Sequence, residues 1–369
     1  MTLARSTDHS TSGFSLVELM IAMLLGVVVI AGIIALFVGN SRASALVSGQ
    51  ARLQENARYA FDFISRGARQ AGYFGCAPQP QNIVKGLVGN WSDMPEFDIT
   101  RIVDGHEGNR GGTWTPSLSG LPGGSPGNLN NDPGGAIDVD LIVPGSDVLV
   151  FRNMRQPGQR LLQPLLPTGN AVVAAAAIGS NFDVGDIVMV ADCEQGAVFR
   201  VTGINSDASQ ATLLRESGVG VFDNAANIDS PAGLVPARLS FFDRGYGAEA
   251  TVGAVESTYF FVAPSLHEDR FGNNPLALWQ KVGSVGPVEL VQGVEDLQVL
   301  YGIDTTLSDG ISNPNQYVPF SAVPSDVGQI VAIRATLRVN SIDAVSEDGR
   351  RLVRTFSKTI LLRNSRPEV

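Results

Sequence analysis

The stretch from Leu19 to Val38 reads LMIAMLLGVVVIAGIIALFV and contains 20 residues without a charge. An α-helix rises 1.5 Å per residue, so this run spans about 30 Å, the thickness of the hydrocarbon core of a bilayer. A secretory signal has a shorter apolar region with a small-residue cleavage site after it, and no such site follows here. The run therefore predicts a membrane-spanning helix at about residues 16–38.

A second helical pattern continues directly from this run. Apolar residues recur at steps of three and four over about residues 43–72, and no proline occurs before Pro78. The charged residues fall mostly off this apolar stripe. We expect one continuous helix over residues 14–72, with a first half that is apolar all round and an amphipathic second half that packs on a globular head.

The remaining chain, residues 73–369, has the pattern of a β-rich domain. Short runs rich in Val, Ile, Phe and Tyr alternate with turn residues. These runs cover 137–143, 147–152, 184–191, 197–204, 257–263, 286–292, 295–303, 330–340 and 352–362. Residues 105–135 contain ten Gly and four Pro, which predicts a long flexible loop. The expected fold class is α+β, a long helix packed on a β-rich head.

The charge distribution bears on the partners of the head. The chain carries a net charge of −10, residues 14–72 carry +2 and residues 1–13 are neutral, so residues 73–369 carry −12. Binding to phosphates without sequence preference requires clustered Lys and Arg. We therefore expect no direct binding of nucleic acid.

The residues that precede the apolar run form a recognisable motif. Gly13-Phe14-Ser15-Leu16-Val17-Glu18 follows a short polar segment. It resembles the class III signal of type IV prepilins. The resemblance implies that a prepilin peptidase removes the leader 1–13 by cutting between Gly13 and Phe14, and that the new amine of Phe14 is N-methylated. A departure from many major pilins is that this half contains Gly26, Gly32 and Gly39 but no proline.

Glu18 needs a physical reason to lie in an apolar helix. A charged residue at the bilayer centre costs roughly 2.5–3.5 kcal/mol. The resemblance implies that Glu18 pairs with the Phe14 amine of a neighbouring subunit during filament assembly. A buried charge is tolerated when it is paired. The alternative is that Glu18 lies in the headgroup zone of the membrane without a partner.

A second resemblance lies at the other end of the chain. The segments 58–76, 288–304, 331–339 and 361–364 resemble PilW-type minor pilins, whereas residues 80–280 show no match by position. The resemblance implies a non-enzymatic structural subunit that primes assembly of a type IV pilus, sits at its tip and supports twitching motility and adhesion. The implied partners are other minor pilins, the major pilin, a tip adhesin, the prepilin peptidase and the inner-membrane assembly platform.

The same resemblance implies a location and leaves two rivals. Before assembly the chain would span the inner membrane once with a periplasmic body, and afterwards it would lie at the pilus tip on the cell surface. One rival is a pseudopilin of type II secretion, which shares the N-terminal motif. The other is a membrane-tethered periplasmic enzyme with a prepilin leader.

Cys76 and Cys193 are the two cysteines of the chain. Export to the periplasm would place them in an oxidising compartment. A bridge between them would close a loop of about 118 residues and stabilise the fold by roughly 2–5 kcal/mol. Two free, buried thiols are the alternative, and the sequence leaves both open.

Patterns that resemble enzyme or metal sites are weak. Gly123–Gly127 fits G-x-S-x-G, but it lies in the Gly/Pro-rich stretch without the strand and helix that a nucleophile elbow requires. His9, His106 and His267 lack zinc-ligand spacing. A group of oxygen donors departs from EF-hand spacing and reads better as turn formers: Asn128, Asn130, Asp132, Asp138 and Asp140. We expect no catalytic residue, cofactor or metal.

Overall fold

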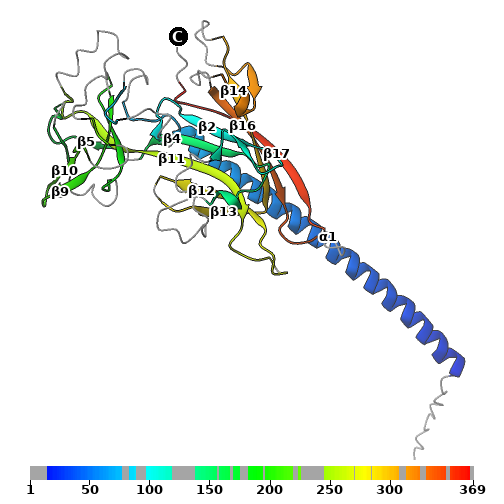
Figure 1. The fold of residues 1–369 in the computed structure, drawn as a ribbon. Helices are drawn as coiled ribbons and strands as arrows, with labels where there is room; N and C mark the ends of the chain where they lie inside the picture. Colours follow the sequence, from blue (N-terminus) through cyan, green and yellow to red (C-terminus); the bar gives the residue numbers. More distant parts are fainter. Residues whose placement is uncertain are drawn as a thin grey trace, which may run out of the picture.

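Helix α1 (Leu16–Gln70) has 55 residues and extends away from a β-rich head (Figure 1). This computed structural model describes residues 15–76, 83–88, 97–118, 138–155, 158–166, 169–174, 182–193, 196–218, 223–225, 245–269, 271–283, 285–306, 313–324, 330–345 and 350–365. At 1.5 Å per residue the helix is about 80 Å long. The expected α+β fold with a long N-terminal helix is confirmed.

The end of α1 is set by the backbone. Gly72 adopts a left-handed conformation with φ of 72°, which glycine reaches without a Cβ penalty. The amide of Ala71 still donates to the carbonyl of Gly67, and the amide of Gly72 donates instead to Arg152 in the head. The helix therefore stops where its backbone turns to bond with the backbone of a strand.

The head contains three sheets. The largest has ten strands, seven of them in the order β1 (Ile83–Lys85), β8 (Gly196–Arg200), β7 (Ile187–Ala191), β11 (Thr251–Pro264), β4 (Val148–Met154), β2 (Val103–Gly108) and β3 (Trp114–Thr115). Beside this path, β12 (Leu276–Val282) pairs with β11 and with β13 (Val288–Gln292), and β5 (Gln159–Arg160) pairs with β11.

The two smaller sheets are antiparallel. One has the order β6 (Ala171–Ala174), β10 (Gln210–Leu214) and β9 (Gly203–Ser206). The other has the order β15 (Gln316–Val318), β14 (Val294–Ile303), β16 (Ile330–Asn340) and β17 (Val353–Leu361). Two 3₁₀ helices complete the described elements, η5 (Val139–Leu141) and η9 (Phe320–Ala322).

Strand β11 connects two parts of the head by changing its neighbours. Its first residues, from Thr251, pair with β7, whereas Val255–Phe260 pair with β4 and Thr258–Pro264 pair with β12. Twelve of its 14 residues are buried. The strand thus joins the region beside α1 to the region around β7 and β8 (Figure 1).

The main core lies where α1 meets the sheets. Side chains of α1 such as Leu53 and Ile64 pack with Phe151 of β4, Phe260 of β11 and Leu337 of β16, and all five are essentially inaccessible to solvent. A second core around β7, β8 and β10 does not include the helix. The helix is therefore an integral part of one core and not an appendage.

Several predicted boundaries differ from the structure. Residues 105–118 of the predicted flexible loop 105–135 contain most of β2 and all of β3, and residues 119–137 lie outside the described residues. The predicted strand 137–143 contains a 3₁₀ turn, because the carboxylate of Asp138 accepts a hydrogen bond from the Asp140 amide. The predicted strand 197–204 is divided into β8 and β9, and β7 begins only at Ile187.

Candidate assembly surface of the helix and head

Glu18 lies in the first turn of α1, where its carboxylate is exposed. A negative charge is favourable there because the unpaired amides of the helix start carry a partial positive charge. The amide of Leu19 donates to the carbonyl of Ser15, so the helix is already formed around Glu18. Gly13 and Phe14, the predicted cleavage and methylation residues, lie outside the described residues, and the pairing of Glu18 with a neighbour's amine stays a prediction.

The first half of α1 presents large apolar side chains to its surroundings. From Ser15 to Ser48 every described residue is at least partly exposed. Leu16 is 75% exposed and Phe37 73%, which is far outside what a soluble helix tolerates over this length. Among the described residues, α1 is the helix long and apolar enough to cross a membrane. This half must therefore be covered by lipid or by other subunits.

Small residues let the second half of α1 approach the head closely. Gly49 is its first buried residue, and a Cβ there would overlap Val345 Cγ1. At Gly67 a Cβ would lie 2.9 Å from Phe151 and 3.0 Å from Phe260, closer than ordinary packing allows. Ala60 and Ala68 are fully buried. The expected amphipathic half, with its apolar face on the head, is present.

Polar contacts fix the helix along its length. Arg52 forms an ion pair with Asp343 at 3.1 Å where the helix enters the head. Asn56 Nδ2 donates to the carbonyl of Gln292 at 3.1 Å, and Asn364 Nδ2 donates to the carbonyl of Ala71 at 2.9 Å. The sequence reasoning missed these residues, because each bond joins positions more than 200 residues apart and no local pattern marks them.

A disulfide links the chain after α1 to the large sheet. Cys76 and Cys193 are bonded, with their Cα atoms 4.5 Å apart, and Cys193 follows β7 closely. Cys193 has a left-handed φ of 68°, which is uncommon for a residue other than glycine. Of the two alternatives that the sequence left open, the structure has the bridge. It holds the end of the helix to the sheet.

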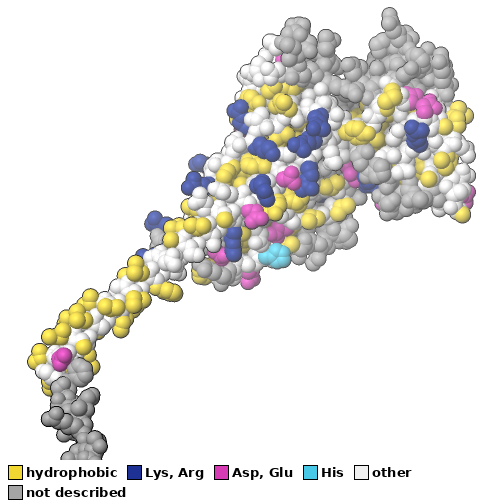
Figure 2. All heavy atoms as spheres, turned by 180° about the vertical axis from the view of Figure 1, so that it is seen from behind, with side chains coloured by type: hydrophobic (Ala, Val, Ile, Leu, Met, Phe, Trp, Pro, Cys, Tyr) yellow, Lys and Arg dark blue, Asp and Glu magenta, His cyan; other side chains and the backbone are white. Residues whose placement is uncertain are grey.

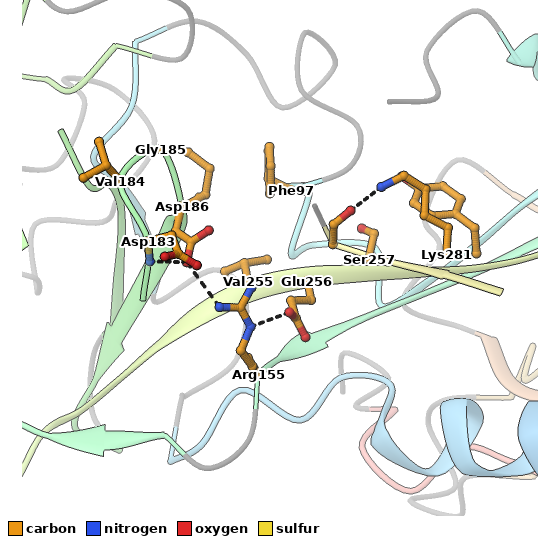
Figure 3. Close-up of a pocket in the computed structure, with 13 residues that line it drawn as sticks. Phe97, Arg155, Asp183, Val184, Gly185, Asp186, Val255, Glu256, Ser257 and Lys281 are labelled. Carbon is orange, nitrogen blue, oxygen red and sulfur yellow. Dashed lines mark hydrogen bonds and ion pairs between the residues drawn. The ribbon is translucent and has the colours of Figure 1, made fainter. Parts of the chain in front are cut away.

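The head also contains a cavity of about 340 Å³, and charged side chains that line it bind one another (Figure 3). Arg155 contacts Glu256 at 2.5 Å and Asp186 at 3.3 Å. Burial raises the pKa of the Asp186 carboxyl above its ordinary value. Lys281 Nζ donates to the carbonyl of Gly283. The contacts of Arg155 join the end of β4 to β11 and to the start of β7, so the charged lining has a structural role at this junction.

The other candidate sites are placed as follows. Asp138 and Asp140 lie at η5, while Asn128, Asn130 and Asp132 fall outside the described residues, as do Gly123–Gly127 and His9. His106 Nδ1 lies 2.9 Å from the carbonyl of Pro116, and burial lowers its pKa. Within the described part of the chain, no group of three His, Cys, Asp or Glu side chains is arranged to hold a metal ion.

Two regions of the chain match known families. Residues 8–34 match the family described as Prokaryotic N-terminal methylation motif, and residues 251–360 match the family described as Type IV Pilus-assembly protein W. The second match extends from β11 to β17 and so includes the four-stranded sheet beside α1. No curated protein and no solved structure matches the chain significantly. The two matches confirm the two families that the sequence resembles. The second match includes 288–304 and 331–339 but not 58–76 or 361–364, and it begins at residue 251, inside the stretch 80–280 where the sequence showed no match.

Proposed function

We propose that this type IV pilus-related pilin is a minor pilin, a structural subunit that primes pilus assembly and sits at the pilus tip with other minor pilins. The observation that carries the proposal is α1. The exposed apolar half of α1 is continuous with a second half that packs in the core of the head, and Glu18 lies in the first turn of the helix. Such a helix can leave the bilayer and pack among identical helices while it carries its head outward.

In this proposal the first half of α1 holds the chain in the inner membrane before assembly, with the head in the periplasm. The prepilin peptidase cuts after Gly13, and the assembly platform then moves the subunit into the filament. The major pilin and the other minor pilins cover the apolar half there. The tip position, contact with a tip adhesin, twitching motility and adhesion belong to the proposal.

The two rivals make different demands on the chain. A type II secretion pseudopilin would share the motif at 8–34, but the match of residues 251–360 to a pilus-assembly family favours the pilus. The matched families give no support to a membrane-tethered enzyme, since both are families of pilin segments. The buried charges around Arg155 are also engaged with one another.

The proposal is tested by processing and filament entry. Mass spectrometry should find the mature chain beginning at Phe14, and shear preparations of surface pili should contain it. Gly13→Val should retain all 13 leader residues and stay out of the filament, because the peptidase reads the small residue before the cut. Thr11→Val is the matched control and should be cut normally. A wild-type chain with an intact Met1, or one absent from sheared pili, would contradict the proposal.

A further inference from the structure

Positive charge is concentrated beside the second half of α1, although the chain as a whole carries −10. Six exposed cationic side chains lie there and are called the basic strip: Arg58, Arg66 and Arg69 of α1, and Arg354, Lys358 and Arg363 in and after β17. Glu55 and Asp62 are the carboxylates on this stretch of the helix, so six cations less two carboxylates leave +4. Figure 2 shows Lys and Arg side chains gathered on the head where the helix joins it.

Contacts along the helix make the strip one continuous surface. Lys358 Nζ donates to Ser65 Oγ at 3.0 Å, and six residues later Asn364 bonds to Ala71. Strand β17 thus runs alongside α1 in the same direction. Lys358 pairs in register with the buried Ala335 of β16, so its side chain lies on the face of the sheet that packs on the helix.

Most of these cations have no carboxylate of their own. Asp62 binds Arg66 at 3.0 Å. Within the described part of the chain, no carboxylate lies within ion-pair distance of Arg58, Arg69, Arg354 or Arg363. Like charges that share a surface repel one another, and an external anion relieves that repulsion. The strip is therefore complementary to an acidic partner.

The strip borders an open sheet edge. β17 is the last strand of its sheet and pairs with β16 alone among the described strands. Seven of its nine residues are exposed. Half of the backbone amides and carbonyls of an edge strand point away from its neighbour and can pair with a strand of another chain. Leu361, 61% exposed, adds apolar area to this edge.

A groove of about 300 Å³ lies at the far end of the strip. Arg69, Tyr73 and Arg363 line it, together with Gln70, Asn153, Met154 and Asn364. Arginine and tyrosine are enriched at protein interfaces, where a guanidinium binds a carboxylate with two parallel hydrogen bonds. Arg69 and Arg363 line the same groove without carboxylate partners among the described residues, so the groove can bind an Asp or Glu side chain of another chain.

We infer that the basic strip docks an acidic segment of a neighbouring pilin-type subunit, which pairs with the edge of β17 and places a carboxylate between Arg69 and Arg363. The inference rests on the proposed function, because a filament brings the next subunit alongside α1. Anionic lipid headgroups are too distant: Arg58 lies 20 residues beyond Val38, about 30 Å along the helix. A strand of another protein can form hydrogen bonds with the unpaired backbone amides and carbonyls of β17, whereas a nucleic acid would only neutralise the cations of the basic strip.

The test places a photo-crosslinking amino acid at Thr355 of β17 in the full-length chain, in cells that assemble pili. Ala208, in the turn between β9 and β10, is the control position. We expect a Thr355 adduct with a pilin-type subunit, through a peptide rich in Asp and Glu, and none at Ala208. Arg354→Glu with Lys358→Glu should reduce the adduct at least about fivefold, because complementary charge governs encounter and register.

The matched control reverses two exposed arginines elsewhere, Arg110→Glu with Arg160→Glu, and should leave the adduct unchanged. Arg69→Glu with Arg363→Glu reverses the strip at the groove, outside β17, and should also lower the yield, which separates docking from any folding defect of β17. An adduct that survives both strip reversals, an adduct with nucleic acid, or no Thr355 adduct from chains found in sheared pili overturns the inference. Absence of the wild-type chain from pili would contradict the proposed function instead, since adduct and incorporation are scored separately.

Discussion

Glu18 is the only charged side chain between Ser15 and Ser41, so its contribution can be isolated by substitution. We expect Glu18→Ala to be cleaved normally and to remain in the membrane, because Gly13 is unchanged and an ionisable group leaves the apolar helix. Entry into the filament should fail, since an unpaired amine at a low-dielectric contact is costly. Pili sheared from the surface and the membrane fraction are each probed for the chain.

Two further substitutions of Glu18 separate charge from size. Glu18→Gln keeps the shape and loses the charge, and it should fail like Glu18→Ala. Glu18→Asp keeps the charge with a shorter reach and should be intermediate. Equal incorporation of all four chains would mean that the head alone decides docking.

Asp147 is a buried carboxylate that joins two sheets and should give the head a characteristic pH dependence. It accepts hydrogen bonds from the amides of Gly108 and Val299, at 2.9 and 2.8 Å. Burial nevertheless raises its pKa from 3.8 to about 6. The folded state therefore prefers the protonated carboxyl, and this stabilisation, full below pH 3.8, is lost as the pH rises through about 6.

Substitution with Asn removes that pH dependence. Relative to Asp147→Asn, the free energy of unfolding of the wild type should fall between pH 3.8 and about 6. A shift of this size corresponds to on the order of 3 kcal/mol. Denaturant unfolding of both chains across this range measures the difference. Parallel profiles for the two chains would show that Asp147 titrates in the folded state as it does in the unfolded chain.

Glycine shows how far a single residue type can be interpreted from sequence. The density of Gly in 105–135 predicted a flexible loop, yet Gly105 lies in β2, where a Cβ would overlap the Tyr301 hydroxyl. A Cβ at Gly108 would likewise overlap the carbonyl oxygen of Ser146. A glycine required for close packing and a glycine required for a turn look identical in a sequence, because the difference lies in a neighbour far along the chain.

At the scale of elements, the disulfide offers the most direct measurement. We expect Cys193→Ser to destabilise the head by roughly 2–5 kcal/mol, since the bridge restricts the unfolded chain. Thermal unfolding of the full-length protein measures the loss. Cys76→Ser with Cys193→Ser should cost no more than either single change, because the two residues act as one bond. Thiols that react with an alkylating reagent in the unreduced, unfolded wild type would contradict the bridge.

The elements differ in how well the sequence predicts them. Helix α1 and strand β16 were placed within two residues of their ends, because apolar periodicity and flanking glycine are local signals. The partners of β11 were not foreseeable, since β4, β7 and β12 come from segments up to about a hundred residues away and pairing leaves no local trace. The role of Glu18 stays a prediction from a motif, whereas Arg354, Lys358 and Arg363 become candidates only once β17 lies against α1.

At the scale of the whole molecule, the helix and head form one mechanical unit. The second half of α1 shares the main core with strands of the largest and the four-stranded sheets. Asn364 binds the carbonyl of Ala71 at its end, Arg152 accepts from the amide of Gly72, and the disulfide holds the chain beyond it. A displacement of the apolar half must therefore move the head with it. This coupling is what extraction of a subunit from a membrane into a filament requires.

The same arrangement predicts which side of the membrane each end occupies. A disulfide persists in an oxidising compartment, so the proposed topology has the head outside the cytoplasm and the leader inside, with the apolar half of α1 as the span between them. Because Cys76 and Cys193 are bonded to each other, an introduced thiol supplies the signal. Ala208→Cys, in the exposed turn between β9 and β10, should react with a membrane-impermeant maleimide in intact spheroplasts. Ser6→Cys, combined with Gly13→Val to retain the leader, should react only after lysis. Labelling of Ser6→Cys in intact spheroplasts, or protection of Ala208→Cys, would contradict the single-span topology. The proposed cleavage at Gly13 and the proposed pairing of Glu18 both depend on that topology.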